Sequence, residues 1–145
     1  MMGFALFAQH GLGLEPCPLC VLQRAGTIAL GLVFLLAALH DAGRLGARLW
    51  GLGLLGVAGL AASVSARQVW LQSLPPDQVP DCGPGLDYML EVFPLTETLK
   101  MAFTGSGECA EVSWSFLGLS MPMWSLLWFL ALGCLGLLRN AGDSA

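Results

Sequence analysis

The sequence predicts an all-α membrane protein, a four-helix transmembrane bundle with one long outer loop that carries short amphipathic helices. Hydrophobic residues make up 56% of the 145 residues and charged residues only 11%, whereas soluble domains carry about 25% charged residues. The apolar residues also gather into stretches that approach or reach the roughly 17–25 residues of a spanning helix. The net charge of −4 argues against a nucleic-acid partner, which requires a basic surface.

The first predicted span covers residues 1–14 and is short. At about 1.5 Å per residue it reaches only ~21 Å across a hydrocarbon core of ~30 Å. It carries Gln9 and His10, which either lie at the membrane interface or line a ligand pocket. The stretch lacks the basic start and small-x-small site of a signal peptide. We therefore expect a shortened first span and a translation start upstream of Met1.

The other three spans are predicted at residues 19–39, 49–68 and 121–138. Pro18 favours a helix start at the second span, because proline is tolerated in the first helical turn. The third span contains small residues in a spacing that lets helices approach closely in lipid, namely Ala58, Ala61, Ala62, Ser65 and Ala66.

The arginines outside the spans predict the orientation. Arg44 and Arg48 lie between the second and third spans, and Arg139 follows the last one. Such residues accumulate in cytoplasmic loops, so both termini are expected in the cytoplasm and residues 69–120 outside. Within this outer loop, apolar spacing over residues 86–93 predicts a short amphipathic helix. Pro94 interrupts it, the spacing resumes to residue 103, and the run 112–119 is expected to lie along the membrane surface.

The five cysteines are the main candidates for chemistry. Four fall outside the bilayer or at its outer boundary, namely Cys17, Cys20, Cys82 and Cys109, whereas Cys134 lies within the last span and is predicted to be a packed apolar thiol. An even set of cysteines facing an oxidising compartment favours disulfide chemistry. Cys82, among prolines, is expected to face an incoming protein thiol, and Cys109 to face the Cys17-Pro-Leu-Cys20 motif.

The position of this CxxC motif at a helix start favours a thiolate, because the helix N-terminus carries about half a positive charge. Arg24 follows Cys20 by four residues and shares its helix face. An arginine inside a span marks function by default. Its expected partner is the Cys20 thiolate or an electron-accepting ligand, and the apolar setting suits a lipid-soluble quinone. Further candidates to close the quinone site lie at the outer end of the third span, namely Gln68, Trp70 and Gln72.

Two other interpretations of the cysteines remain. The first is a zinc site made by all four, although zinc sites usually pair two CxxC-like knuckles and Cys82 and Cys109 lie far apart in the sequence. The second is a pair of static disulfides, although a CxxC bridge closes too small a loop to stabilise the chain much.

Taken together, these residues resemble the disulfide bond formation protein B (DsbB) family. The matching segments, from about Phe4 to Leu138, are Gln9-His10, Glu15-Pro-Cys-Pro-Leu-Cys20, Gln23-Arg24, Cys82-Gly-Pro-Gly85, Gly107-Glu-Cys-Ala-Glu111, Trp114 and Phe116-Leu-Gly-Leu-Ser-Met-Pro-Met-Trp124. The chain departs from the family at its N-terminus, where the resemblance leads us to expect roughly ten further apolar residues in the first span.

The resemblance implies a single four-helix domain over residues 1–145 in the bacterial inner membrane, with residues 69–120 as a periplasmic loop. It implies bound ubiquinone or menaquinone and a DsbA-type thioredoxin-fold oxidase as partner. Gln9, His10 and Gln72 are the residues that we expect to line this quinone. Carried over, Cys82 forms the mixed disulfide with the partner, and Cys109 pairs transiently with Cys17. Cys20 then meets the quinone, which Arg24 orients.

Two other functions remain as alternatives. A vitamin K epoxide reductase-like enzyme also joins a CxxC motif to a quinone, but that family places the motif in a late helix. A non-enzymatic cysteine-rich membrane scaffold or metal-binding protein is the second alternative.

Overall fold

The computed structural model describes residues 2–13, 16–40, 43–112 and 114–142 and is mostly helical. The elements in chain order are α1 (Met2–Gly11), α2 (Pro18–Leu39), α3 (Arg44–Ser73), α4 (Leu86–Val92), α5 (Leu95–Thr104), α6 (Gly107–Ala110), β1 (Ser115–Phe116), β2 (Leu119–Ser120) and α7 (Met121–Gly142). Glu15 of the matched motif and both end residues of the predicted first span, 1 and 14, lie outside the described residues.

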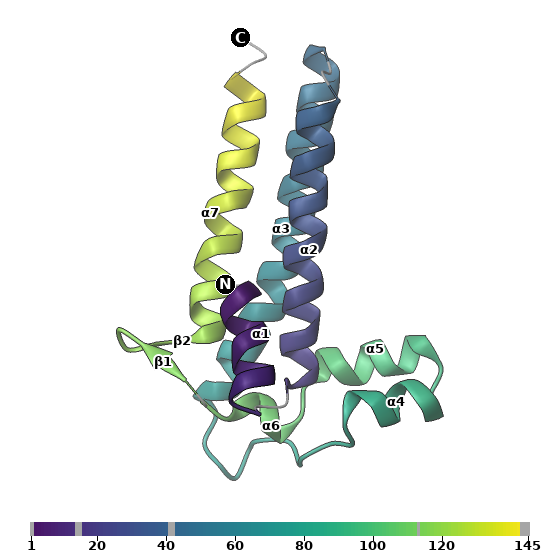
Figure 1. The fold of residues 1–145 in the computed structure, drawn as a ribbon, viewed down its shortest axis with the longest axis vertical. Coiled ribbons are helices and arrows are strands. Elements are labelled where there is room, and N and C mark those ends of the chain that lie inside the picture. The colour runs from purple at the N-terminus through teal and green to yellow at the C-terminus, as the bar shows by residue number, and fades with distance from the viewer. Residues whose placement is uncertain (1, 14–15, 41–42, 113, 143–145) are drawn as a thin grey trace.

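Three long helices form the body of the molecule. The helices α2, α3 and α7 stand side by side along the longest axis (Figure 1). In the described part of the chain these are the three helices long and apolar enough to cross a membrane. A helix satisfies its own backbone hydrogen bonds, as lipid requires. Their outward faces carry exposed leucines such as Leu32, Leu60 and Leu135. The prediction of a helical membrane bundle is thereby confirmed.

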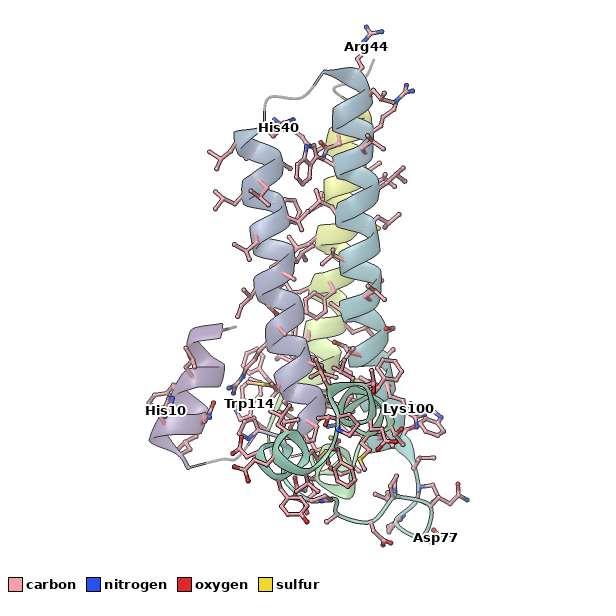
Figure 2. The ribbon with its side chains drawn as sticks, turned by 90° about the vertical axis from the view of Figure 1, so that its right-hand side faces the viewer. His10, His40, Arg44, Asp77, Lys100 and Trp114 are labelled. Carbon is pink, nitrogen blue, oxygen red and sulfur yellow. The ribbon has the colours of Figure 1, made fainter. Side chains whose placement is uncertain are left out.

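The helix α1 has ten residues and is the short member of the bundle. It lies beside the half of α2 that contains Cys20 (Figures 1 and 2). The helix α3, by contrast, extends beyond the span expected at residues 49–68 at both ends.

The helix α3 is the centre of the packing, since it contacts both α2 and α7, which scarcely touch each other. Small residues let the backbones approach. A Cβ atom placed on Gly26 of α2 would lie 2.9 Å from the Cβ of Ala61, and one on Gly133 of α7 would lie 2.8 Å from that of Ala58. The buried residues of this interface are Leu30, Leu54, Ala58, Ala61, Ala62 and Phe129.

The two ends of the bundle differ in character. The end of α2, the start of α3 with Arg44, and the end of α7 lie at one end of the molecule, and the helices α4, α5 and α6 lie at the other end (Figures 1 and 2). Pro94 is the N-cap of α5, so it separates two short helices as the sequence predicts. The arginine-bearing ends and the cysteine-bearing loop are therefore at opposite ends of the molecule.

The segment before α7 contains a small hairpin that the sequence did not predict. The strands β1 and β2 pair antiparallel, with Ser115 opposite Ser120. The two turn residues Leu117 and Gly118 have φ angles of 53° and 78°, as in the mirror-image turns that favour hairpins. Two strands of two residues each carry no alternation of apolar and polar residues that a sequence pattern could reveal.

Candidate functional site

The CxxC motif opens the helix α2. Cys17 is the N-cap residue, and its sulfur accepts a hydrogen bond from the Cys20 backbone N–H at 3.4 Å. The two sulfurs are 2.9 Å apart. Cys17 is buried and Cys20 is half-buried. The capping geometry follows from the sequence, because Pro18 at the first helical position needs no N–H partner and the turn then brings residue 20 back over residue 17.

A third thiol approaches from the outer loop. Cys109, on the single-turn helix α6, has an exposed fraction of 0% and packs against Cys17, Leu19 and Leu71. Its sulfur lies 3.9 Å from the hydroxyl oxygen of Ser106, and it shares a hydrogen bond with the Cys17 thiol. Cys17 therefore contacts thiols from two separate parts of the chain.

These contacts shift the pKa values of Cys17 and Cys109 in opposite directions. The hydrogen bond from Cys17 is the main cause that lowers the pKa of Cys109 to about 6, and backbone hydrogen bonds at Ser106 and Leu19 lower the same pKa further against the opposing effect of burial. The pKa of Cys17 is raised, first by its hydrogen bond to Cys109 and then by the bond to Cys20 and by burial. Cys109 is therefore the thiolate of this pair and Cys17 the proton donor.

Cys82 lies on the outside of the same region. It is exposed, and its segment is attached to the start of α6, where the Gly107 N–H donates to the Asp81 carbonyl at 3.3 Å. A Cβ atom on Gly107 would lie 3.3 Å from the Cys82 sulfur and 2.7 Å from the Pro80 carbonyl oxygen. Glycine at position 107 therefore leaves room for the exposed Cys82, and Gly107 itself precedes the buried Cys109 by two residues.

Two buried glutamines complete the surroundings of the CxxC motif. The side-chain nitrogen of Gln68 on α3 lies 3.5 Å from the Cys17 sulfur and 3.4 Å from the Cys20 sulfur. The amide nitrogen of Gln23 donates to the Gln68 side-chain oxygen at 2.7 Å. The sequence predicts Gln68 only as a candidate to close a quinone site, and it predicts no role for Gln23. The sequence does contain a signal for this pair, namely one glutamine in each of two apolar spans. Buried amides need hydrogen-bond partners, so two such glutamines are candidates to bond each other.

The other predicted ligand residues are not gathered into one cluster. Arg24 is half-buried and donates to the side-chain oxygen of Gln9, which joins α2 to α1. His10 is exposed. Gln72 accepts a hydrogen bond from the Ser120 hydroxyl at 2.7 Å, so it connects α3 to the hairpin. Trp70 is exposed, with the Arg67 guanidinium 4.4 Å from its ring centre.

Cys134 differs from the sequence expectation. It is exposed on α7 rather than packed inside the bundle, because its side chain points to the outer surface of a helix whose small residues face α3. Within residues 2–13, 16–40, 43–112 and 114–142, no three His, Cys, Asp or Glu side chains are grouped so that they could hold a metal ion.

Comparison with known proteins gives one consistent result. The family model described as disulfide bond formation protein DsbB matches residues 1–138. A protein of Chromobacterium violaceum named disulfide bond formation protein B is 58% identical over 129 residues, which cover 88% of this chain and 77% of that protein. Proteins with the same name from Nitrosococcus oceani and Methylococcus capsulatus are 53% and 52% identical, over 94% and 96% of this chain and 81% and 85% of theirs. No solved structure matches the chain.

Proposed function

Because the chain belongs to the DsbB family of membrane disulfide bond formation proteins, we propose that it reoxidises a periplasmic DsbA-type dithiol oxidase and passes the electrons to a membrane quinone. Membership of the family makes it a disulfide-forming oxidoreductase. The observation that carries the finer proposal is the position of Cys109. It contacts Cys17, and it follows by two residues the Gly107 against which the Cys82 segment lies.

The proposed route uses two thiol–disulfide exchanges in series. A partner thiolate attacks the Cys82 sulfur of a Cys82–Cys109 disulfide, and Cys109 leaves as a thiolate. The second partner thiol then resolves the mixed disulfide, which oxidises the partner and releases Cys82 as a thiol. A low pKa makes Cys109 a good leaving group, since exchange is faster when the departing thiol is more acidic.

The second exchange moves the same two electrons to the CxxC motif. The Cys109 thiolate attacks the Cys17 sulfur of a Cys17–Cys20 disulfide, and Cys20 leaves as a thiolate. Cys82 then attacks the Cys109 sulfur, which restores the Cys82–Cys109 disulfide and leaves Cys17 as a thiol. Each exchange breaks one S–S bond and forms one, so the net result is a partner disulfide and a reduced Cys17–Cys20 pair.

The residues around Cys20 fit a quinone. Bound ubiquinone or menaquinone supplies an acceptor of two electrons and two protons. Arg24 lies one helical turn deeper than Cys20, and its guanidinium, which donates to Gln9, is a hydrogen-bond donor in an apolar setting, as a quinone carbonyl requires. In this proposal Gln9 orients Arg24. His10 and Gln72 remain predicted contacts of the quinone, with less support, since His10 is exposed and Gln72 is bound by Ser120.

We further propose the inner membrane as the location, with the four reactive cysteines on its periplasmic side. Arg44, Arg48 and Arg139 lie on or beside the ends of the long helices that are opposite to the cysteines. An excess of arginine and lysine favours the cytoplasmic side. The loop at residues 69–120 then faces the periplasm, where a DsbA-type oxidase is available.

The direct test is oxidation of a reduced DsbA-type protein by the purified chain in detergent, with and without ubiquinone or menaquinone. We expect one quinol for each partner disulfide. Cys20→Ser should abolish quinol formation. Mixed with the oxidised partner, Cys109→Ser should trap a Cys82–partner adduct, because Cys82 attacks the partner disulfide and Cys109 is no longer there to displace the partner from Cys82. Partner oxidation that is independent of added quinone would contradict the proposed acceptor.

A further inference from the structure

The amide of Gln68 touches both sulfurs of the CxxC motif, and a second amide fixes which end of it does so. We propose that Gln68 is a catalytic residue that stabilises the Cys20 thiolate by hydrogen bonding, and that Gln23 is a positioning residue that orients the Gln68 amide. The inference rests on the proposed function in one respect, namely that Cys17 and Cys20 form the redox pair.

The donor geometry is the first part of the argument. A primary amide carries two N–H groups on one nitrogen. In this structure that nitrogen lies 3.5 Å from the Cys17 sulfur and 3.4 Å from the Cys20 sulfur, so each sulfur can receive one N–H. Both contacts lie between α2 and α3, at the end of the bundle where the cysteines gather.

The orientation of the amide is the second part. Gln68 also has an acceptor end, and its side-chain oxygen lies only 3.9 Å from the Cys20 sulfur. A rotation of the amide would therefore turn the oxygen towards a thiolate, which repels it. The 2.7 Å hydrogen bond from the Gln23 nitrogen to the Gln68 oxygen opposes this rotation. Gln23 thus acts on the sulfurs only through Gln68.

Burial is the third part, because it increases the effect of each donor. The exposed fractions of Gln68 and Gln23 are 3% and 9%. Burying an amide is costly unless its polar atoms are bonded, and a hydrogen bond in surroundings of low dielectric constant is electrostatically stronger than one in water. The two buried amides thus find their hydrogen-bond partners in each other and in the two sulfurs.

The consequence concerns the redox equilibrium of the pair. Reduction of the Cys17–Cys20 disulfide adds two electrons and leaves Cys20 as a thiolate, with one proton taken up by Cys17. Hydrogen-bond donors stabilise the thiolate more than the neutral disulfide sulfur. The Gln68 donors therefore favour the reduced form and hold Cys20 in the charged state that reacts with an electron acceptor.

The test measures the equilibrium of Cys17–Cys20 with glutathione in purified protein in detergent, in a Cys82→Ser, Cys109→Ser background. Gln68→Met keeps the length of the side chain but removes both donors, and should lower the equilibrium constant for reduction about tenfold, or ~30 mV in potential. Gln68→Glu replaces the donors with a negative charge and should lower it further. Gln23→Met should lower it about threefold, because the donors remain but are no longer oriented.

A double variant and a control make the result specific. Gln23→Met should have no effect in a Gln68→Met protein if Gln23 acts only through Gln68. The control is Ser65→Ala, which removes a buried hydroxyl of the same helix that donates to the Ala61 carbonyl, and should leave the equilibrium unchanged. Circular dichroism identifies folded variants. An unchanged equilibrium in folded Gln68→Met, or an undiminished Gln23→Met effect in the double variant, would overturn the proposal.

This measurement needs neither a quinone nor a protein partner. If the wild-type chain fails to reduce quinone, the proposed function is wrong but the equilibrium still reports on Gln68. If quinone reduction is normal and Gln68→Met does not shift the equilibrium, only the inference about the amides is wrong.

Discussion

At the scale of single residues, Cys17 is the position on which the reactive groups converge. Its thiol contacts Cys20 along the chain and Cys109 across it, and it receives the amide of Gln68 from a third element. The Cys82 segment is hydrogen-bonded to Gly107, two residues before Cys109, yet the two cysteines differ in burial, since Cys82 is exposed and Cys109 is buried. The site thus has an outer thiol that a protein can reach and inner thiols that it cannot.

The role proposed for Arg24 is tested by Arg24→Ala. The substitution leaves every sulfur in place but removes the charged donor, and a hydrogen bond to a charged group contributes about 1.5–3 kcal/mol. We expect the KM for quinone to rise, or kcat to fall, on the order of 10- to 100-fold. The matched control is Arg67→Ala, since Arg67 donates to the Thr104 carbonyl. Equal quinone kinetics in Arg24→Ala and wild type would contradict the assignment.

The opposite pKa shifts of Cys17 and Cys109 predict that the nucleophilicity of Cys109 depends on pH. With a pKa lowered to about 6, Cys109 should be a thiolate at neutral pH and become protonated, hence less nucleophilic, as the pH falls below about 6. Ultraviolet titration of a protein that keeps Cys17 and Cys109 and has alanine at Cys20, Cys82 and Cys134 measures this thiolate. Cys17→Ala should move the midpoint of Cys109 upward, because it removes the largest cause of the lowering. A Cys109 midpoint that is unchanged by Cys17→Ala would show that the Cys17 hydrogen bond is not what lowers the pKa of Cys109.

At the scale of secondary-structure elements, close helix packing explains how the site is held. The helices cannot use the hydrophobic effect in lipid, so their association depends on tight contact between small residues. The α3 helix presents Ala58 and Ala61 to glycines on α7 and α2. This contact fixes the rotation of α3 relative to α2, and that rotation aims Gln68 at the cysteines.

The packing is tested by two glycine substitutions in helices. Gly133→Ala places a methyl group 2.8 Å from the Cβ of Ala58, and overpacking of this kind typically costs about 1–3 kcal/mol. Gly31→Ala has nothing within 4 Å of its new Cβ and should be neutral or stabilising by up to ~1 kcal/mol. Thermal unfolding in detergent should separate the two variants. A Gly133→Ala protein as stable as wild type would mean that the helices can move apart at no cost.

At the scale of the whole molecule, the structure has a basic end and a redox end. Arg44 and Asp77 lie at opposite extremes of the longest axis (Figure 2). The helices between them are long and apolar enough to cross a membrane, and in the proposed orientation the two ends face different compartments. In the proposed route electrons would enter and leave on one side of the membrane, and no helix would need to carry them across.

This polarity predicts which cysteine is accessible in intact cells. After reduction, a membrane-impermeant thiol reagent should label Cys82 from the outside, because it is exposed in the outer loop. A cysteine introduced at Arg44 should be labelled only after the membrane is permeabilised. The reverse pattern would contradict the orientation drawn from the arginines.

The sequence by itself determined the membrane class, the long helices and the candidate cysteines. Each depends on local information, namely the transfer of about 20 apolar residues into lipid, the helix start at Pro18, and residue types that carry redox chemistry. It did not predict the hairpin at Leu117, because the strands are too short to show a period. It predicted that Cys134 is packed, whereas the residue is exposed on α7, since periodicity in an all-apolar helix does not say which face is outward.

Only the tertiary structure decided which side chains meet. The contact of Cys109 with Cys17, and of Gln68 with both sulfurs of the CxxC motif, depends on how α3 and α6 are rotated and translated against α2. That arrangement is set by packing between small residues distant in the chain, whose energies are individually weak and summed over the whole interface. Hydropathy is a property of each segment alone, and so it fixes the helices but not the register in which they pack.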